Sequence, residues 1–144
     1  MERPLADTQR KPNRMESDSR PLDNELIVII DDDQSTGDGL SALFESLGYR
    51  SAIFPSAEEY LSSKLKADTS CLILDVHLSG MSGPDLQSRL IADGACTPIV
   101  FITGRFEQNV RNRVIAAGAL DYLIKPFIEK SVIDCVEKAL SAEK

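Results

Sequence analysis

Short apolar segments of this 144-residue chain end in polar residues whose side chains can do phosphate chemistry. The residues that follow four of these segments are Asp31-Asp32-Asp33, Asp75, Thr103 and Lys125. A carboxylate can bind a hard cation or attack phosphorus, while a hydroxyl or an ammonium group can stabilise phosphate oxygens. These residue types predict a phosphoryl-transfer site, provided that the fold brings them together.

The acidic residues of this set predict a metal site. If the strands before Asp31 and Asp75 are neighbours, as in the flavodoxin-like strand order, Asp31, Asp32 and Asp75 crowd into one pocket. Three such carboxylates repel one another unless they are protonated or bound to a cation. Only oxygen ligands are in prospect, and the chain has one histidine, so Mg2+ is the predicted cofactor. Asp33 is expected to be a helix cap or a surface charge.

The same positions suggest a reaction. A carboxylate at the edge of such a site can become an aspartyl phosphate, while Lys125 and the metal offset the charge of the transition state. Thr103 would donate its hydroxyl to the product phosphate. Each residue also has a plainer interpretation, because an aspartate run is often a solvated turn and Thr103 suits any strand. The hypothesis therefore depends on their common position at strand ends.

The segments between these residues alternate between apolar runs and amphipathic stretches. Strands are predicted at 26–30, 50–54, 71–74, 98–102 and 120–124. The first helix between them is expected to end at Gly48, and the second to start after Ser56 and include Leu65. The third is expected to start at Pro84, with Leu86, Leu90 and Ile91 on one face. The last two are expected to span 107–117 and to carry 132–140. This alternation predicts an α/β fold with a doubly wound five-stranded parallel sheet, flavodoxin-like with strand order 2-1-3-4-5, and helices on both faces. In such sheets ligands bind beyond the carboxyl ends of the strands.

Composition divides the chain into two parts. Residues 1–24 carry equal numbers of acids and bases, three prolines and almost no large apolar residues, so they are predicted to be a disordered tail. The net charge of −7 therefore belongs to the predicted domain at 25–144. This acidity argues against direct binding of nucleic acid or anionic membranes.

Apolar segments and cysteines bear on where in the cell the protein is expected. No apolar run approaches the roughly 20 residues of a membrane-spanning helix, and the first residues are charged where a secretory signal is apolar. Cys71, Cys96 and Cys135 are far apart and lack metal-ligand spacing, which predicts reduced thiols. We therefore expect a cytoplasmic protein.

Four stretches, IVIIDDD, LILDVHLSGMSG, PIVFITG and DYLIKPF, resemble the response-regulator receiver family of two-component signalling in their order and spacing. The resemblance covers residues 25–142. It implies that Asp75 is the phosphoacceptor and that Asp31 and Asp32 hold Mg2+ together with Asp75. It also implies that His77 contributes only its main-chain carbonyl to the metal, and its side chain is expected to be solvated.

The resemblance also implies a switch. Thr103 and Lys125 match the family's switch pair, Tyr122 matches its aromatic switch residue, and Lys125-Pro126 lies at its usual cis peptide bond. On phosphorylation Thr103 would move and Tyr122 would turn from an outward to an inward rotamer. The surface of the fourth helix, fifth strand and fifth helix would then change.

The function implied is a signalling switch, not an enzyme beyond its own phosphorylation and dephosphorylation. Its partners would be a histidine kinase or phosphotransfer protein and a downstream effector or output domain, with a second copy of the chain as a further partner on phosphorylation. The end at Lys144 leaves open a single-domain regulator, a relay or the receiver part of a transcriptional regulator.

Two alternative functions differ in the residues that they require. Asp31-x-Asp33 after a strand imitates the nucleophile motif of the haloacid-dehalogenase phosphatases, with Asp31 as nucleophile, but that hypothesis leaves Asp75 unexplained. A phosphate-independent interaction module would be expected to have lost the acceptor or the acidic pair, and both are present.

Overall fold

The computed structural model describes residues 25–142, with side chains described to Ser141; the predicted tail at 1–24 lies outside this range. Strands and helices alternate in the order β1 (Leu26–Ile30), α1 (Gln34–Ser46), β2 (Arg50–Phe54), α2 (Ala57–Ser62), a 3-10 helix (Lys66–Asp68), β3 (Cys71–Asp75), α3 (Gly83–Ala92), β4 (Ile99–Thr103), α4 (Gln108–Ala116), β5 (Asp121–Ile124) and α5 (Glu129–Ala142). All strand pairs are parallel, in the order β2-β1-β3-β4-β5. The predicted flavodoxin-like α/β fold is confirmed.

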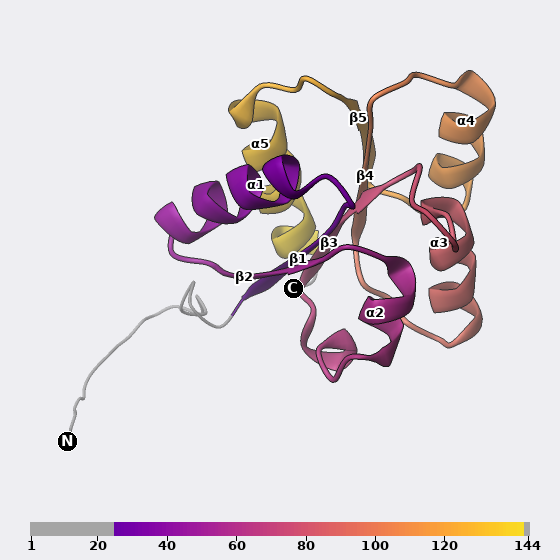
Figure 1. Cartoon of the computed structure of the whole chain (residues 1–144), viewed down its shortest axis with the longest axis horizontal. Coiled ribbons are helices and arrows are strands. Elements are labelled where there is room, and N and C mark those ends of the chain that lie inside the picture. The colour runs from indigo at the N-terminus through magenta and orange to yellow at the C-terminus, as the bar shows by residue number, and fades with distance from the viewer. Residues whose placement is uncertain (1–24, 143–144) are drawn as a thin grey trace.

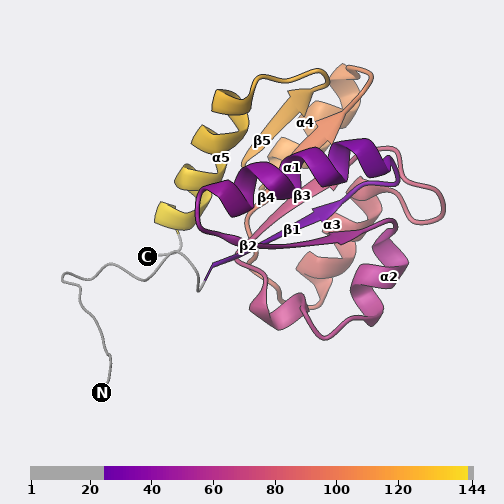
Figure 2. The same ribbon diagram turned by 60° about the vertical axis from the view of Figure 1, so that its left-hand side comes forward.

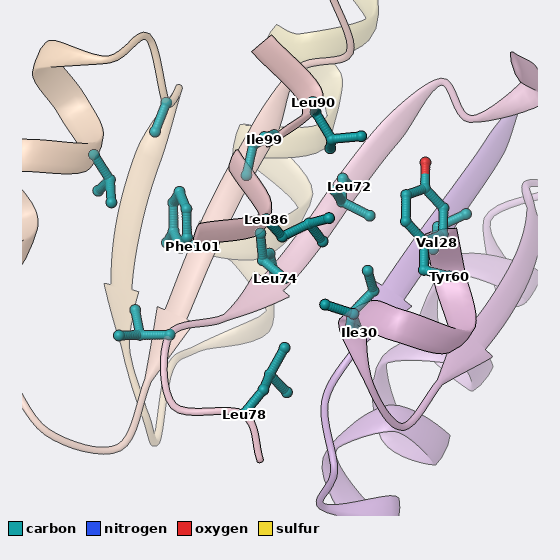
Figure 3. Close-up of a cluster of buried hydrophobic side chains, with 14 of the residues drawn as sticks. Val28, Ile30, Tyr60, Leu72, Leu74, Leu78, Leu86, Leu90, Ile99 and Phe101 are labelled. Carbon is teal, nitrogen blue, oxygen red and sulfur yellow. The ribbon is translucent and has the colours of Figure 1, made fainter. Parts of the chain in front are cut away.

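The sheet is covered on both faces (Figures 1 and 2) because its central strands are apolar throughout. Every residue of β1, β3 and β4 is buried. Alternate side chains enter two cores: Val28 and Leu72 pack with residues of α2, α3 and α4, as Figure 3 shows, whereas Ile27 and Ile73 pack with α1 and α5. None of the helices described between residues 25 and 142 is long and apolar enough to cross a membrane.

Helix ends follow the capping residues of the sequence. The side chain of Asp33 accepts a hydrogen bond from the backbone of Ser35 at the start of α1, so Asp33 is the cap that was predicted. Ser56 caps α2 by accepting from the backbone of Glu59. Gly48, a predicted helix stop, has a φ of 95°, a conformation that glycine adopts without steric cost.

Two predictions about helix residues were wrong. Leu65 lies outside α2, because the backbone turns to an extended conformation at Ser63. Ile91 is 50% exposed, although it was expected on the buried face of α3. Gln87 is buried in that face instead and donates from Nε2 to the carbonyl of Val114 at 3.0 Å, so a polar residue fastens α3 to α4.

Candidate functional site

Asp31, Asp32 and Asp75 meet at the carboxyl edge of the sheet. Asp31 follows β1 and Asp75 ends β3, and the two strands pair with Ile30 opposite Leu74. One carboxylate oxygen from each of the three aspartates lies within 4.8 Å of the others. Asp31 and Asp75 are buried and Asp32 is exposed. The predicted clustering of the three acids is therefore present.

Lys125 reaches this acidic cluster from the end of β5. Its Nζ donates to Oδ2 of Asp31 at 2.8 Å and lies 3.7 Å from Oδ2 of Asp75. Burial alone would lower the pKa of Lys125, but the hydrogen bond to Asp31 and the charges of Asp75 and Asp31 outweigh it and raise that pKa. Lys125 is therefore a fixed positive charge beside both carboxylates. Its peptide bond to Pro126 is cis.

The electrostatics of Asp75 show an excess of negative charge. Burial, followed by the charge of Asp31, raises the pKa of Asp75 to about 6, while Lys125 and the backbone N–H of His77 oppose this rise. One ammonium group thus faces two buried carboxylates, and the exposed Asp32 adds a third carboxylate to the cluster. Crowded carboxylate oxygens with incomplete neutralisation fit a hard divalent cation such as Mg2+.

Thr103 ends β4 beside Asp75, since Asp75 pairs with Ile102 in the sheet. Its side chain is fully buried, and its hydroxyl bonds to the loop that follows. Oγ1 donates to the carbonyl of Arg105 at 3.0 Å and accepts from the Arg105 N–H at 3.1 Å. The hydroxyl is therefore near the sheet edge but bonded within its own loop.

Tyr122 differs from the expectation of an outward rotamer. Its side chain is buried, with 6% of the residue exposed, and Oη accepts a hydrogen bond from the backbone N–H of Glu107 at 3.3 Å. Its ring meets that of Phe106 edge to face, with centroids 6.1 Å apart. The inward position gives the ring apolar neighbours and its hydroxyl a partner, so no outward-to-inward rotation starts from this conformation.

His77 is linked to the site and also to a second loop. Its backbone N–H donates to Oδ1 of Asp75 at 3.2 Å. Its side chain is exposed, as expected, but it is not merely solvated, because Nε2 lies 2.8 Å from Oε1 of Glu107. The contribution of the His77 carbonyl to a metal stays a prediction.

Gly83 and Glu107 are site neighbours that the sequence analysis missed. A Cβ at Gly83 would overlap the carbonyl oxygen of Asp75 and lie 3.1 Å from Cε1 of Phe101. The glycine-rich stretch from Ser79 to Gly83 could have indicated such a close approach. Glu107 carries no comparable signal, because its contacts depend on the path of two loops.

The structure does not favour the phosphatase alternative. The carboxylate of Asp33 accepts hydrogen bonds from the hydroxyl of Thr36 and from the backbone N–H of Ser35, which lower its pKa. The carboxylate of Asp31 is bonded to Lys125. Asp31 and Asp33 therefore do not form a nucleophile and acid pair.

Relatives and a family model agree with this geometry. The model of the response regulator receiver domain matches residues 27–137. Nodulation protein W of Bradyrhizobium diazoefficiens is 38% identical over 119 residues, covering 83% of this chain and 52% of that protein. Response regulator protein TmoT of Ectopseudomonas mendocina is 38% identical over 115 residues, covering 80% and 52%. The chain thus spans about half the length of these curated relatives.

Solved structures show the same fold. The response regulator StyR has a TM-score of 0.75 at 34% identity, covering 83% of this chain and 60% of that one. A response regulator receiver protein from Burkholderia phymatum has a TM-score of 0.70 at 35% identity, covering 81% and 95%. The chain therefore belongs to the response regulator receiver domain family of two-component signalling.

Proposed function

We propose that Asp75 accepts a phosphoryl group from a histidine kinase or phosphotransfer protein in the presence of Mg2+. The observation that carries this proposal is the position of Asp75. It is a buried carboxylate that shares a site with Asp31 and Asp32, with the ammonium group of Lys125 3.7 Å away. A nucleophile, an acidic cation site and a fixed positive charge are therefore adjacent.

The reaction transfers the phosphoryl group from the donor to Asp75. A carboxylate oxygen of Asp75 attacks phosphorus, the bond between phosphorus and the donor atom breaks, and the donor leaves with that electron pair. A pKa of about 6 leaves Asp75 mostly ionised at neutral pH, as a nucleophile requires. Asp31, Asp32 and Asp75, with the carbonyl of His77, would hold Mg2+, which supplies positive charge for the phosphoryl oxygens. Lys125 is positioned to bind one of those oxygens.

Phosphorylation would act on the rest of the molecule through Thr103. To donate its hydroxyl to a phosphoryl oxygen, Thr103 must release the carbonyl of Arg105, which moves the loop before α4. The surface of α4, β5 and α5 would then change for an effector, an output domain or a second copy of the chain. Tyr122 lies within this surface and would respond by shifting its hydrogen bond to Glu107.

The wider role of the chain is inferred from its relatives. One relative is the transcriptional regulatory protein DctR of Rhodobacter capsulatus, of which the chain covers 61%. We infer a cytoplasmic receiver part of such a regulator, at 25–144 with the tail at 1–24, or a separate signalling protein of the same design. The acidic domain itself would not contact DNA.

Intact mass measurement tests the proposal. Incubation with acetyl phosphate and Mg2+ should add one phosphoryl group to the parent protein, and removal of Mg2+ with a chelator should abolish it. Asp75→Asn should stay unmodified while remaining folded. A parent protein that gains no mass, with Mg2+ at saturating concentration, would contradict the proposal.

A further inference from the structure

Glu107 joins three contacts at the N-terminus of α4. Its Oε1 lies 2.8 Å from Nε2 of His77, and its Oε2 lies 3.4 Å from the guanidinium of Arg105. Its backbone N–H donates to Oη of Tyr122 at 3.3 Å. Glu107 thus connects the loop after β3, the loop after β4 and strand β5.

The contact with His77 is separate from the capping of α4. Glu107 occupies the N-cap position of α4, but its side chain makes no capping hydrogen bond. The carboxylate instead reaches a residue 30 positions earlier in the chain. The backbone N–H of His77 also donates to Asp75, so the contact joins the acceptor's own loop to α4.

The contact between His77 and Glu107 depends on the position of the β4–α4 loop. Thr103 holds Arg105 by two hydrogen bonds, and Arg105 in turn contacts Glu107. If Thr103 turns to a phosphoryl group on Asp75, its bond to the Arg105 carbonyl is lost, and Glu107 is then held in place by its contacts with His77 and Tyr122. An interaction made in one state and lost in the other favours the first state by its own strength.

We propose that the contact between His77 and Glu107 is a latch that holds the β4–α4 loop in its unphosphorylated position. This proposal rests on the proposed function, because the latch opposes the movement that phosphorylation requires. His77 and Glu107 are positioning residues, since their side chains act on the loop and not on the phosphoryl group. The two side chains are 45% and 33% exposed, and exposed pairs of this kind shift an equilibrium about two- to fivefold.

A double-mutant cycle with beryllofluoride, a mimic of the phosphoryl group, tests the latch. The variants are His77→Ala, Glu107→Ala and the double variant. Each of them keeps the main-chain carbonyl at position 77. With Mg2+ and fluoride present, beryllium is titrated and binding is followed by amide chemical shifts. Each single variant should bind about two- to fivefold more tightly than the parent, and the double variant should gain no more than the tighter single one.

The matched control is Asp93→Ala, which removes an exposed acid paired with Arg89 at the far end of α3. This variant should bind beryllofluoride as the parent does. Unchanged or weaker binding in the His77 and Glu107 variants, or additive gains in the double variant, would overturn the latch.

A readout without any phosphoryl mimic separates failure of the latch from failure of the proposed function. In the ligand-free protein, His77→Ala should shift the amide signals of residues 105–110, because the contact crosses to that loop. Signals that stay in place would overturn the latch, whatever the protein binds. If those signals shift but the parent does not bind beryllofluoride, the proposed function fails, and with it the regulatory role of the contact.

Discussion

Replacing Gly83 by alanine should damage both stability and the acceptor site. Gly83 is buried at the start of α3, and its N–H donates to the carbonyl of Val76 at 3.0 Å. An added Cβ would overlap the carbonyl oxygen of Asp75 and press on the ring of Phe101. Phe101 is fully buried, and the backbone after Asp75 is held by a 2.9 Å hydrogen bond from Val76 to Ile102. Neither neighbour can yield without moving the sheet edge.

Overpacking of a well-packed core costs about 1–3 kcal/mol and sometimes more. Because backbone must move here, we expect Gly83→Ala to lower the free energy of unfolding by about 2 kcal/mol or more. Gly39→Ala is the matched control, since Gly39 lies within α1 and a Cβ there meets no heavy atom within 4 Å. That variant should gain about 0.5–1 kcal/mol, as alanine does in a helix interior.

Urea denaturation of the two variants and the parent provides the measurement, and the rate of phosphorylation by acetyl phosphate provides a second one. Gly83→Ala should also react more slowly, because the displaced carbonyl belongs to Asp75. If Gly83→Ala is as stable and reactive as Gly39→Ala, the close approach between α3 and β3 is not as the structure has it, and the reasoning is refuted.

Three further predictions concern buried polar groups. Without divalent cations, Asp75→Asn should raise the free energy of unfolding at pH 7 by about 1–3 kcal/mol, because the native pKa of Asp75, about 6, exceeds the unfolded value and the ionised group opposes folding. This gain should vanish below about pH 4, and a gain that does not change with pH in urea denaturation would contradict the prediction. Cys96 is exposed, whereas burial and the Asp121 carboxylate raise the pKa of Cys135 to about 12, so iodoacetamide should label Cys96 first in the native protein, as peptide mapping would show. Tyr60→Phe should cost about 1 kcal/mol in urea denaturation, because it removes the 2.9 Å bond to Thr69, and an unchanged midpoint would contradict this.

The position of the site at the sheet edge could be predicted from the sequence, because the central strands are buried. The residues of β1, β3 and β4 are buried on both faces of the sheet, so their near-continuous apolar composition marks where each strand must end. The polar residue that follows then lies at the carboxyl edge, which is how Asp31, Asp75 and Thr103 come together. The alternation of strands and helices predicts parallel pairing, and parallel pairing places these strand ends at the same edge.

Features that depend on loop paths could not be predicted. The contact between His77 and Glu107 joins two loops that no periodicity relates. The inward position of Tyr122 depends on a backbone N–H donor at Glu107, which the sequence does not reveal. The exposure of Ile91 and the burial of Gln87 are likewise outside what a hydrophobic pattern predicts, because such a pattern places apolar residues inside and polar residues outside.

Locating the phosphoryl group tests the central claim most directly. The protein would be incubated with acetyl phosphate and Mg2+, its acyl phosphate reduced with borohydride, and the reduced residue identified by peptide mapping. We expect the modification at Asp75 alone, because the carboxylate of Asp31 is engaged by a 2.8 Å hydrogen bond from Lys125, whereas Oδ2 of Asp75 lies 3.7 Å from the same ammonium group. Modification of Asp31, or of no aspartate in this cluster, would contradict the account.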